Sequence, residues 1–191
     1  MNKNRLEAFS DGVFAIIITI MVLELKVPHG SDLATLAPLW PVFLSYAMSF
    51  VFVAIYWSNH HHLFQAAKQV NGIILWANSH LLFWLSLVPF VTGWMGENHF
   101  AAMPVAAYGV VLLCCGGAYK VLTMALLRHH GNHSLLAMAL GSDFKGTASL
   151  VIYVTAVAVA AYASWLSCAL YGVVSVMWLV PDSRIEKRLD Q

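Results

Sequence analysis

Charged side chains are scarce in this chain of 191 residues. Only 10% of the residues are Asp, Glu, Lys or Arg, whereas 60% are hydrophobic. A soluble domain carries about 25% charged residues, and the mean hydropathy of +0.73 departs from that class in the same direction. The composition therefore predicts an integral membrane protein. Because the net charge is only +1, nothing in the overall charge indicates a nucleic-acid partner.

Cysteine is also rare, and the usual ligand-binding and catalytic motifs are missing. Cys114, Cys115 and Cys168 lie inside apolar runs, where they are typical of small packing residues rather than of a disulfide framework. The sequence contains no GxxxxGKS/T, GxGxxG or HExxH motif and no TVGYG filter. Since no nucleophile–base pair is visible either, nothing in the sequence supports an enzyme, a resident cofactor or a bound metal.

Six long apolar stretches are present instead. A helix of about 20 residues crosses a hydrocarbon core of about 30 Å. The predicted fold is therefore all-α, with a single six-helix transmembrane domain over residues 1–191. We expect Pro89 to kink the third helix and the stretch 128–145 to form an interfacial loop. The predicted helices run from about Leu6 to Leu25, Leu39 to Trp57, Ile73 to Trp94, Ala101 to Leu127, Thr147 to Tyr162 and Trp165 to Val180.

The basic residues favour one orientation of these helices. One side of the membrane would carry only Lys26, and the positive-inside rule makes that the outer side, with both termini cytoplasmic. A five-helix arrangement would split the charges. The start of the chain could be taken for a signal peptide, but Glu7 and Asp11 are wrong for one and no small-residue cleavage site follows. The cytoplasmic side would carry Lys3, Arg5, Lys68, Arg128, Lys145, Arg184, Lys187 and Arg188.

The first predicted helix carries one apolar stripe. At 3.6 residues per turn, spacings of three and four bring its members to one side. By itself this pattern is typical of a face that packs against another helix. The threonine in it can satisfy its hydroxyl on its own backbone. The stripe consists of Gly12, Ile16, Thr19, Ile20 and Leu23.

Polar residues occupy the cytoplasmic end of this helix. Arg5, Ser10 and Asp11 form either an interfacial cluster that sets the depth of the helix or a buried network. In a buried network, Arg5 or a histidine of another helix would offset the charge of Asp11. The second helix offers the triplet 60–62 for this purpose. Asn78, at a similar depth in the third helix, makes a contact from Asp11 through the triplet geometrically plausible.

Three consecutive histidines are poor evidence for a metal site. On a helix they point in three directions, so the triplet 60–62 cannot bind one ion without ligands from elsewhere. The sequence therefore predicts no metal site.

The segment "RLEAFSDGVFAIIITIMVLEL", residues 5–25, resembles the first helix of the transmembrane protein 175 family in its short prokaryotic form. The family signature is an Arg, three residues, then Phe-Ser-Asp, and it stands here as Arg5, Phe9, Ser10 and Asp11. The segments "WSNHHHLF", "NSHLLFWLSLVPF" and "WLVPDSRIEKR" also look like matching parts of the family. The resemblance therefore covers nearly the whole chain.

This resemblance implies a cation channel that favours potassium and assembles as a homotetramer, with a central pore lined by the first helix and no carbonyl filter. It places the hydrophobic constriction at Ile16, with Ile20 and Leu23 one and two turns outward, and the pore threonine at Thr19. Glu24 would lie at the outer mouth, where it either raises the local cation concentration or is merely solvated. The implied partners are the prokaryotic plasma membrane and monovalent cations, with permeant K⁺ instead of a cofactor.

The resemblance also implies a structural latch at the cytoplasmic end, which braces the pore helices away from the narrowest point. His62 extends the family's histidine pair into a triplet, which leaves open which histidine is the partner of the aspartate. The expected latch consists of Arg5, Phe9, Ser10, Asp11, Trp57, His60, His61 and Asn78.

Two other functions compete with the channel. A proton-coupled or other secondary transporter needs an ionisable residue near the midplane and paired helix breaks. Asp11 and Glu24 lie near the helix ends instead, and only Pro89 interrupts a span. A membrane haem protein would use histidines from two helices, such as the triplet 60–62 and His80.

Overall fold

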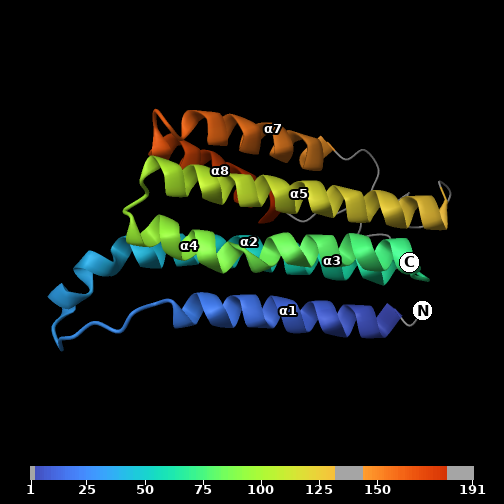
Figure 1. Cartoon of the computed structure of the whole chain (residues 1–191), viewed down its shortest axis with the longest axis horizontal. Coiled ribbons are helices and arrows are strands. Elements are labelled where there is room, and N and C mark those ends of the chain that lie inside the picture. The colour runs from blue at the N-terminus through green and yellow to red at the C-terminus, as the bar shows by residue number, and fades with distance from the viewer. Residues whose placement is uncertain (1–2, 132–143, 180–191) are drawn as a thin grey trace.

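The computed structural model describes residues 3–131 and 144–179, and helices are the only regular elements within these ranges. Figure 1 shows them as long, roughly parallel rods. Two short 3-10 turns, Leu33–Thr35 and Ala37–Leu39, precede the second rod. The helices are α1 (Lys3–Leu23), α2 (Trp40–Ala66), α3 (Gly72–Ser86), α4 (Val88–Glu97), α5 (Ala102–His130), α7 (Phe144–Val159) and α8 (Ser164–Leu179).

The helices form six rods, as the sequence predicts, when α3 and α4 are counted as one. Four segments are long and apolar enough to cross a membrane, and α3 and α4 together form one of them, Gly72–Glu97. The break between them falls at Leu87, two residues before Pro89, because proline is tolerated only in the first turn of a helix. The helices α7 and α8 are also apolar but have 16 residues each, or about 24 Å at 1.5 Å per residue, which is shorter than a hydrocarbon core of about 30 Å.

Two helices extend further than the sequence predicts. The helix α2 ends at Ala66 rather than near Trp57, because its last turns are packed inside the protein and the side chains of His60 and Phe64 are buried. The helix α5 continues through His130 and stops at Gly131, where φ is +82°. Part of the predicted loop 128–145 is therefore helical, while its stretch 132–143 lies outside the described residues.

One end of the bundle, the Lys3 end, gathers the start of α1 with the turn between α2 and α3. The ammonium of Lys3 donates to the carbonyls of Phe64 and Ala67, at 2.9 and 3.1 Å. On the other side of the turn, Nε2 of His130 accepts hydrogen bonds from the backbone N–H groups of Lys68 and Gln69, at 3.1 and 3.3 Å. The turn is thus fixed by α1 and by α5.

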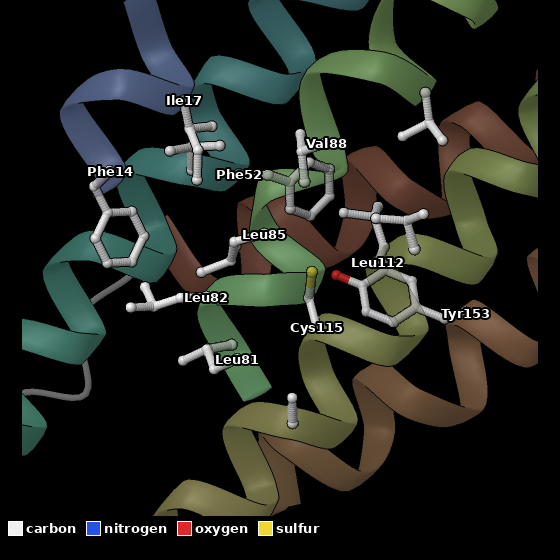
Figure 2. Close-up of a cluster of buried hydrophobic side chains, with 14 of the residues drawn as sticks. Phe14, Ile17, Phe52, Leu81, Leu82, Leu85, Val88, Leu112, Cys115 and Tyr153 are labelled. Carbon is white, nitrogen blue, oxygen red and sulfur yellow. The ribbon is translucent and has the colours of Figure 1, made fainter. Parts of the chain in front are cut away.

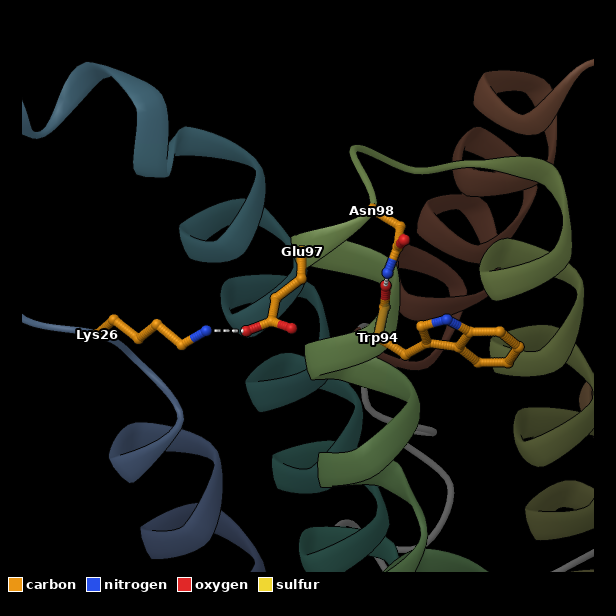
Figure 3. A network of polar contacts seen from close by, with 4 residues as sticks. All are labelled: Lys26, Trp94, Glu97 and Asn98. Carbon is orange, nitrogen blue, oxygen red and sulfur yellow. Dashed lines mark hydrogen bonds and ion pairs between the residues drawn. The ribbon is translucent and has the colours of Figure 1, made fainter.

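The opposite end, the Lys26 end, carries an exposed ion pair and an aromatic cluster. The ammonium of Lys26 lies 2.5 Å from a carboxylate oxygen of Glu97 (Figure 3). Phe100 has a left-handed backbone, with φ of +58°, which places its ring against Trp40 and Trp165. These contacts tie the start of α2, the end of α4 and the start of α8 together.

The helix α1 lies at one edge of the bundle. It packs against α2, α3 and α4, whereas α5 packs against α3, α4, α7 and α8 on the far side. The core between these layers is filled by side chains such as Phe14, Leu85, Leu112 and Tyr153 (Figure 2). Because α1 has neighbours on one side only, much of its surface faces outward.

Candidate functional site

The two faces of α1 differ sharply in burial. Leu6, Ser10, Phe14, Ile17 and Met21 recur at spacings of three and four, and all five are buried. The neighbouring stripe is exposed. Two consecutive residues illustrate the difference: the side chain of Ile16 is 60% exposed, whereas that of Ile17 is only 2% exposed. One residue turns a helix by about 100°, so the packed and exposed faces are adjacent in sequence but separate in space. The exposed stripe consists of Gly12, Ile16, Thr19, Ile20 and Leu23.

The polar members of the exposed stripe need no partner from another helix. The hydroxyl of Thr19 donates to the carbonyl of Ala15 at 2.8 Å, which leaves its lone pairs available on the exposed side. Glu24 follows at the end of the stripe and is exposed. Together with Lys26, Glu97 and other residues it lines a cavity of about 370 Å³ at the Lys26 end. No residue of the exposed stripe lines this cavity, and the carboxylate of Glu24 lies near Gly93 of α4.

A buried hydrogen-bond network joins the packed face of α1 to α2 and α3. Asn78 Oδ1 accepts from His60 Nε2 at 2.7 Å, and its Nδ2 donates to Ser10 Oγ at 3.0 Å. Ser10 in turn donates to the carbonyl of Leu6 at 2.9 Å. Since an amide oxygen only accepts, His60 carries its proton on Nε2 here. All three polar side chains are therefore paired inside the protein, where an unpaired one would be costly.

A second contact lies one residue along α1, at the surface of the subunit. The indole N–H of Trp57 donates to Asp11 Oδ1 at 3.0 Å, and the ring of His61 stacks on Trp57. The structure therefore pairs Asp11 with Trp57 rather than with Arg5 or a histidine, because Asp11 points about 100° away from the buried Ser10. Arg5 and Phe9 are exposed.

The expected latch residues thus separate into two groups. Ser10, His60 and Asn78 are joined by hydrogen bonds in the interior, whereas Asp11 and Trp57 form a partly exposed pair. The extra histidine, His62, takes no part in either group, and within the described ranges its buried Nδ1 has no hydrogen-bond partner. Of the three consecutive histidines, His60 is therefore buried, His61 is exposed at the surface, and His62 belongs to neither group.

Sequence reasoning missed two contacts at the ends of α1. Lys3 binds the end of α2, and Glu97 binds Lys26. Both could have been suspected, because an isolated charge beside a long apolar helix needs a partner. The hydrogen bond and charge of Glu97 raise the pKa of Lys26, whose side chain is well exposed.

Two of the four histidines considered as haem ligands, His60 and His80, form hydrogen bonds with other side chains. His60 uses Nε2 for Asn78, and Nε2 of His80 accepts from the indole of Trp84 at 2.9 Å. In the part of the chain that the structure describes, no cluster of three His, Cys, Asp or Glu side chains could hold a metal ion.

Comparison with known proteins shows to which family this chain belongs. The model of the endosomal/lysosomal potassium channel TMEM175 family matches residues 5–89, which include both latch groups and the exposed stripe. A potassium channel of Chryseobacterium sp. strain P1-3 is 54% identical over 191 residues, which cover both chains completely. The chain belongs to the TMEM175 family.

More distant relatives support the same family assignment. A potassium channel of Streptomyces collinus is 35% identical over 140 residues, covering 67% of this chain and 66% of that one. The crystal structure of a lysosomal potassium-selective channel TMEM175 homolog from Chamaesiphon minutus has a TM-score of 0.80 at 28% identity, and the match covers 93% of this chain and 96% of the other. The TMEM175 fold therefore extends over nearly the whole chain.

Proposed function

We propose that this chain forms a potassium channel whose pore is lined by the exposed stripe of α1. The observation that carries the proposal is the exposure of Ile16 beside the buried Ile17 on a helix that is otherwise firmly packed. This exposed row of side chains is where copies of α1 can meet around a path for cations. The potassium channels among the TMEM175 relatives support the same conclusion.

One chain contributes only one such helix, so several copies must enclose the path. Closed rotational symmetry is the usual solution for identical subunits, and we propose a homotetramer. Residues 1–191 would act as one channel domain in a prokaryotic plasma membrane, with the basic Lys3 end in the cytoplasm. Its partners are lipid, further copies of the chain and monovalent cations, and K⁺ is cargo rather than cofactor.

In the tetramer, four Ile16 side chains would form the constriction, with Ile20 and Leu23 beyond it. A ring of apolar side chains controls conduction by dewetting, and an ion that passes must lose part of its hydration shell. The lone pairs of Thr19, free on the exposed side, can replace some of that water. Glu24 would stand at the outer mouth and concentrate cations there.

The two latch groups have separate proposed roles. The buried network of Ser10, His60 and Asn78 holds α1 in its subunit. The exposed pair of Asp11 and Trp57, with the ring of His61 stacked on the indole, lies on a surface that a neighbouring subunit can contact. Arg5 and Phe9 are exposed on other sides of α1. Such an arrangement braces the pore helices at the cytoplasmic end without narrowing the path.

The structure gives less support to a transporter than to a channel. The break between α3 and α4 is the kind of feature that transporters use, and hydroxyls lie behind it. These hydroxyls are already paired, however: Ser49 contacts Thr92 at 2.6 Å and Tyr108 at 3.1 Å, and Thr92 donates to the carbonyl of Val88. The cluster therefore closes on itself and offers no polar site at the break.

The proposal is tested by reconstituting the purified protein in liposomes or planar bilayers. A K⁺/Na⁺ gradient should give a reversal potential on the side expected for potassium, and mass measurement in nanodiscs should give four copies. Ile16→Asn should enlarge the current and reduce its selectivity, because the amide wets the constriction. Ile20→Asn and Leu23→Asn should act in the same direction but more weakly.

A matched control is Val151→Asn, which adds the same amide to an exposed position of α7, far from α1. It should leave the current unchanged. A stable monomer, or equal currents for Ile16→Asn, Val151→Asn and the unmodified protein, would contradict a pore lined by this stripe. Flux that saturates and shows no single-channel steps would indicate a carrier instead.

A further inference from the structure

The last residues of α5 contact the turn between α2 and α3. Nε2 of His130 accepts hydrogen bonds from the backbone N–H groups of Lys68 and Gln69, at 3.1 and 3.3 Å. Its Nδ1 lies 2.9 Å from the carbonyl of Leu126, one turn earlier in α5. Because an amide N–H only donates and a carbonyl only accepts, the ring is neutral and carries its proton on Nδ1. Only a neutral ring can make this set of contacts.

A second histidine, His129, contacts the same turn through Asn71. The side chain of Asn71 caps the start of α3, since its Oδ1 accepts from the backbone N–H of Ile74 at 2.9 Å. This fixes the orientation of the amide, so its Nδ2 donates to Nδ1 of His129 at 3.2 Å. Both histidines therefore present an unprotonated nitrogen to the turn.

Protonation would remove these contacts. An imidazolium carries a proton on each nitrogen and accepts nothing, so the N–H groups of the turn would lose their acceptor and face a positive charge. The helices α2, α3 and α5 contain no acidic residue that could stabilise this charge. The charged groups beside the turn are basic, namely Lys68 in the turn itself, Arg128 in α5 and Lys3 of α1. The other titratable groups near this end of α2 are the histidines 60–62.

The same turn also holds α1. The ammonium of Lys3 donates to the carbonyls of Phe64 and Ala67, where α2 ends. Beyond the turn, Asn78 of α3 donates to Ser10 of α1. A displacement of the turn would therefore be transmitted to the Lys3 end of α1, both directly and through α3.

We propose that His130 and His129 form a proton-sensitive clamp, which holds the turn and α1 while both rings are neutral and releases them when the rings are protonated. Histidine changes its charge between about pH 5 and 8, so the clamp is closed at the upper end of this range and opens as the pH falls. His130 is half-buried and His129 is exposed, so protons reach both from solution. The effect on ion flow rests on the proposed function, which places this end in the cytoplasm.

The clamp is tested by hydrogen exchange of the full-length protein in detergent, read by mass spectrometry on the segment 67–71. Protection is expressed relative to an unstructured peptide of the same sequence, which removes the pH dependence of the exchange chemistry itself. Between about pH 8 and about pH 5.5 we expect protection to fall about tenfold, as for two lost hydrogen bonds. Protection that does not change with pH would overturn the proposal.

Two variants separate the charge of residue 130 from its hydrogen bonds. His130→Gln keeps an acceptor but cannot be protonated, so protection should be nearly the same at both pH values. His130→Arg is charged throughout and has no acceptor, so protection should be low at both. The control His80→Gln removes a ring that accepts from Trp84 within α3, and the tenfold change should remain. Full pH dependence in His130→Gln would also overturn the proposal.

Ion flow tests the coupling to α1 separately. Acidifying the Lys3 side of a planar bilayer should lower the current about fivefold, because α1 helices released at one end let the apolar ring close and dewet. His130→Gln should not respond in this way, and acidifying the Lys26 side should affect both proteins alike. Exchange that follows the pH while the current ignores it would overturn the coupling. No potassium current at all would count against the proposed function, and the exchange data would still decide on the clamp.

Discussion

The two faces of α1 have similar hydrophobicity and opposite environments. One carries Ile17 against the core, and the other carries Ile16 in the open. In lipid an apolar side chain gains little simply from leaving the bilayer, so helix association depends on close packing and on hydrogen bonds between helices. The packed face has such a bond, from Asn78 to Ser10, whereas the threonine of the open face bonds only its own helix. Polar pairing, more than hydrophobicity, distinguishes the two faces.

The largest difference between the faces should appear when the same amide is placed on each. Ile17→Asn buries an unpaired amide and removes packed atoms, which should destabilise the protein by about 3–5 kcal/mol. Ile16→Asn should leave Tm nearly unchanged. Thermal unfolding and size-exclusion profiles of the two variants measure this directly. Similar losses in both would show that the stripe is also packed in the assembly.

The buried network gives the next largest effect. Asn78→Ala leaves His60 Nε2 and Ser10 Oγ without their shared partner, and we expect a loss of about 2–4 kcal/mol. Ser79→Ala is the control, since this neighbouring hydroxyl bonds only the carbonyl of Leu75 in its own helix. Chemical denaturation in mild detergent compares them. If the two variants unfold alike, the network does not hold α1 to its subunit.

A smaller effect is expected at the surface pair. Trp57→Phe removes the hydrogen bond to Asp11 while keeping an aromatic ring, and because the site is partly exposed the subunit should lose at most about 1 kcal/mol. Trp76→Phe, at a more exposed indole of α3, serves as the control. Should Trp57→Phe dissociate the tetramer, which native mass measurement would reveal, the pair acts between subunits.

The smallest effect is expected at the Lys26 end, where the ion pair between Lys26 and Glu97 lies. Lys26→Gln breaks an ion pair in which both side chains are well exposed, and such pairs contribute little. The raised pKa of Lys26 means that any stabilisation is present at neutral pH and is lost only as the pH rises through that pKa, in the alkaline range. We therefore expect the same Tm for the variant and the unmodified protein between neutral and mildly alkaline pH. A clear drop in Tm at neutral pH would show that the pair anchors α1.

The sequence alone determines where the chain crosses the membrane. Backbone groups in lipid must be satisfied within a helix, so long apolar stretches predict helices, and Pro89 predicts the break at Leu87. The ends were less predictable. The end of α2 was expected near Trp57, but the polar residues that follow it continue the helix because His60 finds a partner in Asn78. Only a neighbouring helix can supply such a partner.

The sequence also determines which residues of α1 share a face, since helical periodicity is a local property. It does not determine which way a face points, because rotating α1 about its axis changes no local interaction. The tertiary structure decides this by the bond between Ser10 and Asn78, which turns Ile17 inward, Ile16 outward and Asp11 toward Trp57. The choice of Trp57 over a histidine followed from that rotation, because two neighbouring side chains on a helix cannot point into the same site.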